Sequence, residues 1–185
     1  GPVIAAAMHR ALAHGTTAAS VLAMVASIRQ QCPAALVAMV SNSIVRRLGG
    51  GAFVHQLADA GFDGLIVPDI DDAEAADLAA ACSERDMGFT MLVAPTTTPD
   101  RLAMLAKQSS GFLYLLARVG LTGESSGAPD IAGRVEEARA VTDLPLAVGF
   151  GISTAQHVAA VTGCADAAVV GSALVRRMAE SDDPA

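Results

Sequence analysis

Short apolar runs recur along the chain at nearly regular intervals, and this recurrence most constrains the fold. They begin near residues 35, 64, 88, 112, 145 and 166, so successive starts are separated by 21 to 33 residues. That separation suits one strand followed by one helix, and helical spacing of apolar residues is found between the runs. Continuous apolar strands that alternate with helices pair in parallel and are covered on both faces. The pattern predicts an α/β fold with six parallel strands.

The expected elements follow from apolar periodicity and from residues that begin or end helices. Two helices come first, over residues 3–14 and from Thr16 to Cys32, with no strand before or between them. We expect strands over 35–40, 64–67, 88–93, 112–117, 145–148 and 167–170, and the later helices over 52–60, 71–85, 98–108, 131–141, 154–161 and 172–179. Residues 41–43 and 49–51 are expected to form turns. No linker or change in composition divides the chain, so we expect one domain over residues 1–185.

Glycine turns follow the last two expected strands. The sequence reads Gly149-Phe150-Gly151-Ile152-Ser153 after one strand and Gly171-Ser172-Ala173-Leu174-Val175 after the next. Backbone N–H groups at such turns before helices suit a phosphate, and a phosphate site formed after the last two strands is common in (β/α)8 barrels. An open doubly wound sheet would instead place its glycine-rich turn after the first strand. The turns therefore favour a barrel, although 185 residues is short for that fold, which usually takes roughly 250.

Composition excludes several function classes. The net charge is −7 and the pI is near 4.9, which argues against nucleic acid and anionic membranes as partners. The three cysteines, Cys32, Cys82 and Cys164, are far apart, as expected of buried thiols in a reducing compartment. The four histidines show no ligand spacing, so no metal site is expected. No signal peptide or uninterrupted membrane-length apolar run is found, and we expect a cytoplasmic protein.

Five motifs in one order support a comparison with a known family. They are Leu65-Ile66-Val67-Pro68-Asp69, Ala94-Pro95-Thr96-Thr97, Tyr114 to Gly123 (YLLARVGLTG), Gly149 to Ser153 and Gly171 to Val175. Together they closely resemble the alpha chain of tryptophan synthase, over the whole chain from Gly1 onward. The resemblance implies a (β/α)8 TIM barrel that is incomplete here, with about six of its eight strands. The first two strands and the final helix would be missing.

The resemblance also implies an activity and a partner. The family cleaves indole-3-glycerol phosphate to indole and glyceraldehyde 3-phosphate by a retro-aldol reaction in tryptophan biosynthesis. It passes the indole to a beta chain within an alpha2-beta2 heterotetramer. The alpha chain needs no metal or organic cofactor, since pyridoxal phosphate belongs to the beta chain.

The resemblance assigns site residues on this chain. Tyr114 would line the pocket and Phe150 would help to wall the indole. The loop from Gly120 to Asp130 resembles a lid whose Thr122 bonds a catalytic aspartate when the lid closes. The residues implied to hold the substrate phosphate are Gly123, Gly149, Phe150, Gly151, Gly171 and Ser172.

The resemblance places both catalytic carboxylates before residue 1. The family uses a glutamate on its second strand, about a dozen residues before Gly1, and an aspartate immediately before Gly1. Two acids within the chain, Asp69 and Asp71, lie at the end of a strand on the rim where barrel chemistry occurs. We expect them to cap and orient the next helix, not to substitute for the missing pair. The chain alone is therefore expected not to release indole.

One segment departs from the family pattern. Asn42 is kept, at a loop that in the family faces the beta chain, but Val40 stands in place of the usual aromatic and Ser43 in place of the usual proline. The pocket wall and the partner surface are expected to differ there. Three hypotheses stay open: a family enzyme seen as a fragment, a non-catalytic protein that binds a phosphorylated ligand or a beta-type partner, and another phosphate-binding barrel enzyme. The match over Tyr114 to Gly123 argues against the third.

Overall fold

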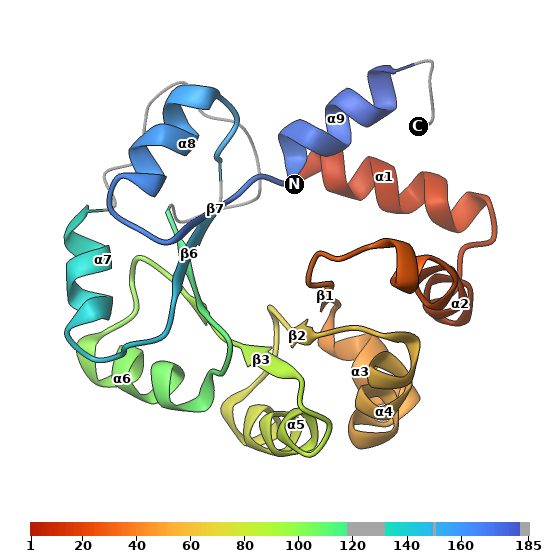
Figure 1. Cartoon of the computed structure of the whole chain (residues 1–185), viewed down its shortest axis with the longest axis horizontal. Helices are drawn as coiled ribbons and strands as arrows, with labels where there is room; N and C mark the ends of the chain where they lie inside the picture. Colours follow the sequence, from red (N-terminus) through yellow and green to blue (C-terminus); the bar gives the residue numbers. More distant parts are fainter. Residues whose placement is uncertain (118–131, 150, 182–185) are drawn as a thin grey trace.

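The computed structural model describes residues 1–117, 132–149 and 151–181. Figure 1 shows strands at the centre and helices around them. The helices are α1 Pro2–Ala13, α2 Ala18–Ile28, the 3-10 helix η1 Arg29–Gln31, α3 Asn42–Leu48, α4 Gly50–Ala60, α5 Asp72–Ser83, α6 Pro99–Gln108, α7 Ala132–Arg139, α8 Ala155–Thr162 and α9 Ser172–Glu180. The strands are β1 Val37–Met39, β2 Gly64–Ile66, β3 Gly88–Thr90, β4 Leu92–Val93, β5 Leu113–Leu116, β6 Leu146–Gly149 and β7 Ala167–Val169.

All strand pairs in the described part are parallel. One sheet has the order β1-β2-β3 and the other β4-β5-β6-β7. Within each sheet, every strand therefore pairs with its neighbour in sequence, as in the wall of a barrel and unlike a doubly wound sheet, whose order reverses. The prediction of an incomplete barrel wall of parallel strands is confirmed.

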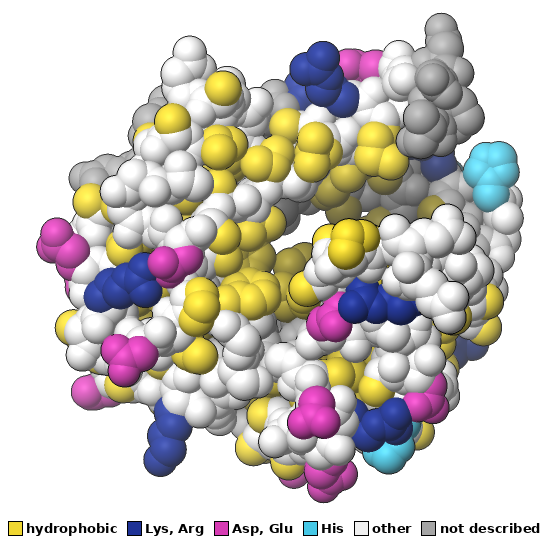
Figure 2. Space-filling model, viewed as in Figure 1, with side chains coloured by type: hydrophobic (Ala, Val, Ile, Leu, Met, Phe, Trp, Pro, Cys, Tyr) yellow, Lys and Arg dark blue, Asp and Glu magenta, His cyan; other side chains and the backbone are white. Residues whose placement is uncertain are grey.

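The wall is open on one side. β1 and β7 end the strand order, and α1 and α9 pack side by side across the gap between them (Figure 1). Figure 2 shows hydrophobic side chains gathered around a hollow in the middle of this face of the molecule. An apolar cavity of about 370 Å³ lies between α1, α2, β1, α3 and α4.

Local signals explain why the helices begin and end where they do. Thr17 caps α2 in a capping box with Ser20, and Asp71 caps α5 by accepting from the Glu74 N–H at 3.0 Å. Pro99 occupies the first position of α6, where its missing N–H costs nothing. Gly61 ends α4 in the left-handed conformation, with φ of 93°.

A continuous buried core of small aliphatic side chains joins the two sheets to the helices. It contains residues from β2, β5 and β6 together with apolar faces of α4, α5 and α6. Phe89 is the largest of the fully buried side chains. Such a core suits closely packed helices on a parallel sheet.

Three predictions at the element level were wrong. Residues 41–43 were expected to form a turn, but Ser41 precedes α3, and only Gly49 of the three glycines breaks the helical path, with φ of 80°. The run 88–93 was expected to be one strand, but it divides at Met91 into β3 and β4, which belong to different sheets. The remaining elements match the predictions within a few residues.

In the described part, no single helix is long and apolar enough to cross a membrane. One bent pair, Pro2–Ala13 with Ala18–Gln31, meets the length and composition together, but its two halves meet at 94°. No group of three or more metal-ligating side chains occurs among the described residues. The cysteines Cys32, Cys82 and Cys164 are free.

Candidate functional site

The end of β6 brings two of the predicted site residues into contact. Gly149 pairs with Leu116 of β5, and Tyr114 lies two residues earlier on that strand. A Cβ on Gly149 would lie 2.7 Å from Cζ of Tyr114, inside van der Waals contact, so only glycine fits beside this ring. Tyr114 is 7% exposed, and burial raises the pKa of its phenol. The ring therefore stays neutral and forms a wall at the end of the strand.

The loop after β6 is anchored by the residues that follow Gly151. Gly151 has φ of 89°, a left-handed conformation that favours glycine. Ile152 is buried, and Thr154 caps α8 by accepting from the His157 N–H at 3.1 Å. The loop that turns at Gly151 is therefore held by the core at Ile152 and by the helix at Thr154.

The start of α9 leaves room for a ligand. Gly171 is the N-cap of α9 and provides no side-chain cap, and Ser172 is the first helical residue. A Cβ on Gly171 would meet no atom of the described residues within 4 Å. No acidic residue lies in the first turn, so the positive end of the helix dipole faces this space without a carboxylate nearby on the helix.

The two glycine turns lie at the same rim. β6 and β7 are neighbours, with Gly149 opposite Val169, so Gly151 and Gly171 follow adjacent strand ends. We call Gly149, Gly151, Gly171 and Ser172 the glycine cradle. N–H groups at a helix N-terminus and at an adjacent turn are the arrangement that binds phosphate in many proteins. The predicted residues Phe150, Thr122 and Gly123 lie outside the described residues.

A polar recess lies beside the glycine cradle. Its volume is about 220 Å³, and it is lined by Ser153, Ala173, Arg176, Arg177 and Glu180. Ser153 belongs to the loop after β6, and the other four residues share one face of α9 because they are three or four positions apart. The recess therefore lies between the loop after β6 and the face of α9 that follows the cradle residues Gly171 and Ser172.

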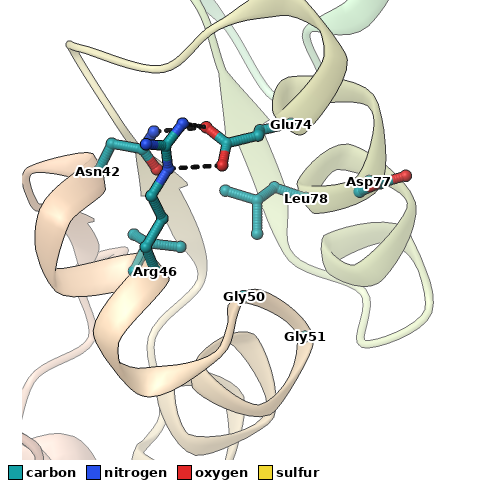
Figure 3. A pocket seen from close by; sticks show the side chains of 8 residues that line it. Asn42, Arg46, Gly50, Gly51, Glu74, Asp77 and Leu78 are labelled. Carbon is teal, nitrogen blue, oxygen red and sulfur yellow. Dashed lines mark hydrogen bonds and ion pairs between the residues drawn. The ribbon is translucent and has the colours of Figure 1, made fainter.

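A second polar site joins α3 to α5 (Figure 3). Asn42 and Arg46 reach from α3 toward Glu74 on α5. The Asn42 amide donates to Glu74 Oε2 at 2.6 Å, and Arg46 Nε donates to Glu74 Oε1 at 2.6 Å. These hydrogen bonds, that from Arg46 above all, lower the pKa of Glu74 from 4.5 to about 2. A cavity of about 250 Å³ adjoins them.

The acids Asp69 and Asp71 have different structural roles. Asp71 caps α5, as predicted. Asp69 instead accepts from the backbone N–H of Asn42 at 2.7 Å, so it caps α3, the helix that the sequence analysis missed. Asn42, which was predicted to lie at a partner interface, is only 7% exposed. Its backbone N–H donates to Asp69 and its side-chain amide donates to Glu74, so it links α3 to the loop after β2 and to α5.

Comparison with known proteins identifies the family. A sequence model of the tryptophan synthase alpha chain family matches residues 1–185. The chain belongs to the tryptophan synthase alpha chain family. Tryptophan synthase alpha chains from Nitrosococcus oceani and Methanosarcina acetivorans are 42% and 43% identical, and the matches cover 96% and 98% of this chain. They cover 66% of each relative, so the chain spans about two thirds of the length of these relatives.

Solved structures of the family agree with the fold. A Mycobacterium tuberculosis tryptophan synthase structure matches with a TM-score of 0.87 and 38% identity, over 98% of this chain and 69% of that one. The tryptophan synthase A-subunit from Pyrococcus furiosus matches with a TM-score of 0.88 and 28% identity, over 98% and 74%. The family's barrel architecture therefore applies to this chain.

The sequence predicted the residues of the glycine cradle and Tyr114 as parts of a site, but it did not predict the link between Asn42, Asp69 and Glu74. One signal was present: Ser41 precedes a possible helix start, and Glu74 follows three residues after the N-cap Asp71. That signal predicts each helix start separately. It does not predict that the two starts bond to each other.

Proposed function

We propose that this chain binds the phosphate of indole-3-glycerol phosphate at the glycine cradle. The observation that carries this proposal is the pair of glycine turns on adjacent strand ends, with open space at Gly171 and an uncapped helix start. The N–H groups of Gly171 and Ser172 would donate to the phosphate, and the Ser172 hydroxyl would add a bond. Gly149, Phe150, Gly151 and Gly123 would complete the contacts, as the family resemblance implies.

The rest of the substrate would extend from the cradle toward the barrel centre. Tyr114 contacts Gly149, so its buried ring would bound the pocket beside the glycerol part. Phe150 would wall the indole, and Thr122 would act from the lid. The reaction of the family, retro-aldol cleavage to indole and glyceraldehyde 3-phosphate, is the activity in which we place this binding.

The free, separated cysteines fit a cytoplasmic setting.

The 185 residues are proposed to bind the substrate without cleaving it. Retro-aldol cleavage needs one carboxylate to stabilise positive charge at the indole N–H and another to move protons at the glycerol hydroxyl and C3. Asp69 is bonded to Asn42, and Asp71 is bonded to the Glu74 N–H and to Arg46. Both acids are thus committed to helix starts, and neither is free to serve as the catalytic pair. A non-catalytic, phosphate-ligand-binding role for this part of the chain is consistent with the same geometry.

The proposed partner is a tryptophan synthase beta chain in an alpha2-beta2 assembly. The segment around Asn42 would face it. Because Asn42 is itself buried, its part would be to hold the first turn of α3 against α5, while exposed neighbours make the contact.

Titration with glycerol 3-phosphate tests the binding proposal. We expect saturable binding by isothermal titration calorimetry and none with glycerol, which lacks the phosphate. Gly171→Ala should keep its stability, because a Cβ there has no neighbour within 4 Å among the residues that the structure describes, yet lose about tenfold in affinity by filling ligand space. Equal binding of glycerol and glycerol 3-phosphate would contradict the proposal.

The absence of catalysis has its own measurement. Incubating the 185-residue chain with indole-3-glycerol phosphate should release no indole above the uncatalysed rate. If indole were released and Asp69→Asn abolished the release, the structural role of Asp69 would be wrong. Asp86→Asn, an acid elsewhere on the chain, is the matched control.

A further inference from the structure

A buried histidine lies directly behind the glycine cradle. His157 of α8 is 6% exposed, one of three buried polar residues in the described part. It occupies the third position after the N-cap Thr154. Its backbone N–H donates to Thr154 Oγ1 at 3.1 Å, and its ring Nδ1 accepts from the Ser153 N–H at 3.4 Å. The side chain of His157 therefore bonds back to the loop that follows Gly151.

This arrangement resembles a capping box but differs in its target. In a capping box, a Glu or Gln at this position reaches the backbone N–H of the N-cap residue itself. Here the residue is histidine, and its ring bonds one residue further back, at Ser153. The bond thus restrains the loop after β6 as well as the helix start. Ile152, the residue between Gly151 and Ser153, is buried, so the core holds the loop next to this bond.

Ser153 occupies a position that matters for both halves of the cradle. It lines the recess opposite Ala173, Arg176 and Arg177 of α9. The placement of Ser153 therefore helps to set the separation between the turn at Gly151 and the start of α9. A shift of about 1 Å in such a separation is enough to weaken contacts that must meet one phosphate from two sides.

The acceptor must be Nδ1, so the proton of the neutral ring lies on Nε2. An aliphatic side chain of similar size at position 157 would lose the bond to the Ser153 N–H, because it has no acceptor. A ring protonated on both nitrogens would lose it for the same reason. An asparagine would keep it, because its Oδ1 lies close to the place of Nδ1. The chain therefore offers a substitution pair that separates the acceptor from the bulk of the side chain.

We propose that His157 is a positioning residue of the glycine cradle, which acts by accepting the Ser153 N–H and so holding the loop after β6 at the right separation from α9. The inference rests on the phosphate-binding function proposed above. His157 acts through the loop, and its effect is on phosphate affinity.

The test compares H157L, H157N and the control H55L by calorimetric titration with glycerol 3-phosphate. His55 is an exposed histidine on α4, so H55L should bind like the wild type. We expect H157L to weaken binding by about fivefold to tenfold, which corresponds to the loss of one hydrogen bond, and H157N to stay within about twofold of the wild type. Equal losses in H157L and H157N would overturn the proposal, because the acceptor would then be irrelevant.

Amide hydrogen exchange supplies a second measurement that needs no ligand. The Ser153 amide should be protected in the wild type and in H157N, and should exchange faster in H157L. If H157L does not fold, two other results can still overturn the proposal. One is fast exchange of the Ser153 amide in the wild type, and the other is a loss of phosphate affinity in H157N. A wild type that binds no glycerol 3-phosphate refutes the proposed function itself. Wild-type binding with an unaffected H157L refutes only the role of His157.

Discussion

At the scale of the residue, two glycines of the cradle have opposite surroundings. Gly149 is pressed against the ring of Tyr114, whereas Gly171 faces open space. The first glycine is therefore required by packing within the protein, and the second leaves room for something outside it. Gly149 ends β6 and Gly171 follows β7, so both lie at the end of an apolar run in the sequence, and the packing around them separates their roles.

Gly149→Ala should destabilise the protein by about 1–3 kcal/mol, the usual cost of an added methyl in a packed site. The methyl would collide with the Tyr114 ring. Urea denaturation measures the change, with Gly171→Ala as the matched control, expected within about 0.5 kcal/mol of the wild type. Adding Tyr114→Leu to Gly149→Ala should recover part of the loss. An unchanged urea midpoint for Gly149→Ala would show that the ring moves aside freely.

A residue's ionisation gives a second prediction at this scale. The Arg46 and Asn42 hydrogen bonds lower the folded pKa of Glu74 to about 2, against 4.5 ordinarily. The carboxylate therefore contributes stability that is fully present above about pH 4.5 and is lost as the pH falls toward 2. Glu74→Gln should flatten this part of the curve of unfolding free energy against pH. Glu84→Gln, an exposed acid of the same type, should leave the slope unchanged.

At the scale of the element, an aspartate before a strand ties down the start of the neighbouring strand. Asp166 directly precedes β7, and its Oδ2 accepts from the Leu146 N–H at 2.7 Å, where β6 begins. Arg139 at the end of α7 pairs with the same carboxylate. These bonds, the one from Leu146 above all, lower the pKa of Asp166.

The same arrangement recurs near the other end of the chain. Asp63 directly precedes β2, and its Oδ2 accepts from the Leu36 N–H at 2.7 Å, just before β1. Arg29 pairs with Asp63 at 3.1 Å. In both places, an aspartate before one strand accepts from the backbone N–H at the start of the neighbouring strand. Both contacts lie at the rim opposite the glycine cradle, the rim that serves stability in barrels.

Asp166→Ala should lower the urea midpoint, because the Leu146 N–H and the Arg139 guanidinium lose their shared acceptor. Asp143→Ala is the control. Asp143 is an exposed acid in the loop between α7 and β6, and its replacement should leave the urea midpoint unchanged. Glycerol 3-phosphate affinity should be the same in both variants, since Asp166 lies at the rim opposite the cradle. A loss of affinity in Asp166→Ala without a loss of stability would contradict this division of the rims.

Elements were predictable where periodicity alone determines them, and not where a tertiary contact does. The strands and long helices carry continuous or helical apolar patterns, and they were found. α3 is short, and three glycines follow within three residues of its end, which reads as a loop. Its start is stabilised by Asp69, 27 residues away in sequence, a contact that no local pattern encodes. The Tyr114–Gly149 contact is hidden for the same reason, because it depends on the register of β5 against β6.

At the scale of the whole molecule, β1 and β7 lie at the two ends of the strand order, and each is paired on one side only. The side chains of Val37 and Met39 on β1 are 37% and 51% exposed, next to the apolar cavity between α1, α2 and β1. An unpaired edge with exposed apolar side chains is a template for pairing with another strand. The net charge of −7 opposes self-association at low salt and is screened at high salt.

We therefore expect the isolated chain to self-associate through β1, more strongly as salt rises. Met39→Lys places a charge on the edge strand and should raise the concentration for half-association by about tenfold, or about 1.4 kcal/mol. Sedimentation velocity over a series of concentrations and salt levels measures this shift. Met104→Lys, which adds the same charge on α6 to a side chain 36% exposed, is the control and should change association little. Equal effects of the two lysines would mean that net charge, and not the β1 edge, governs association, because Met39 lies on an edge strand and Met104 lies on a helix.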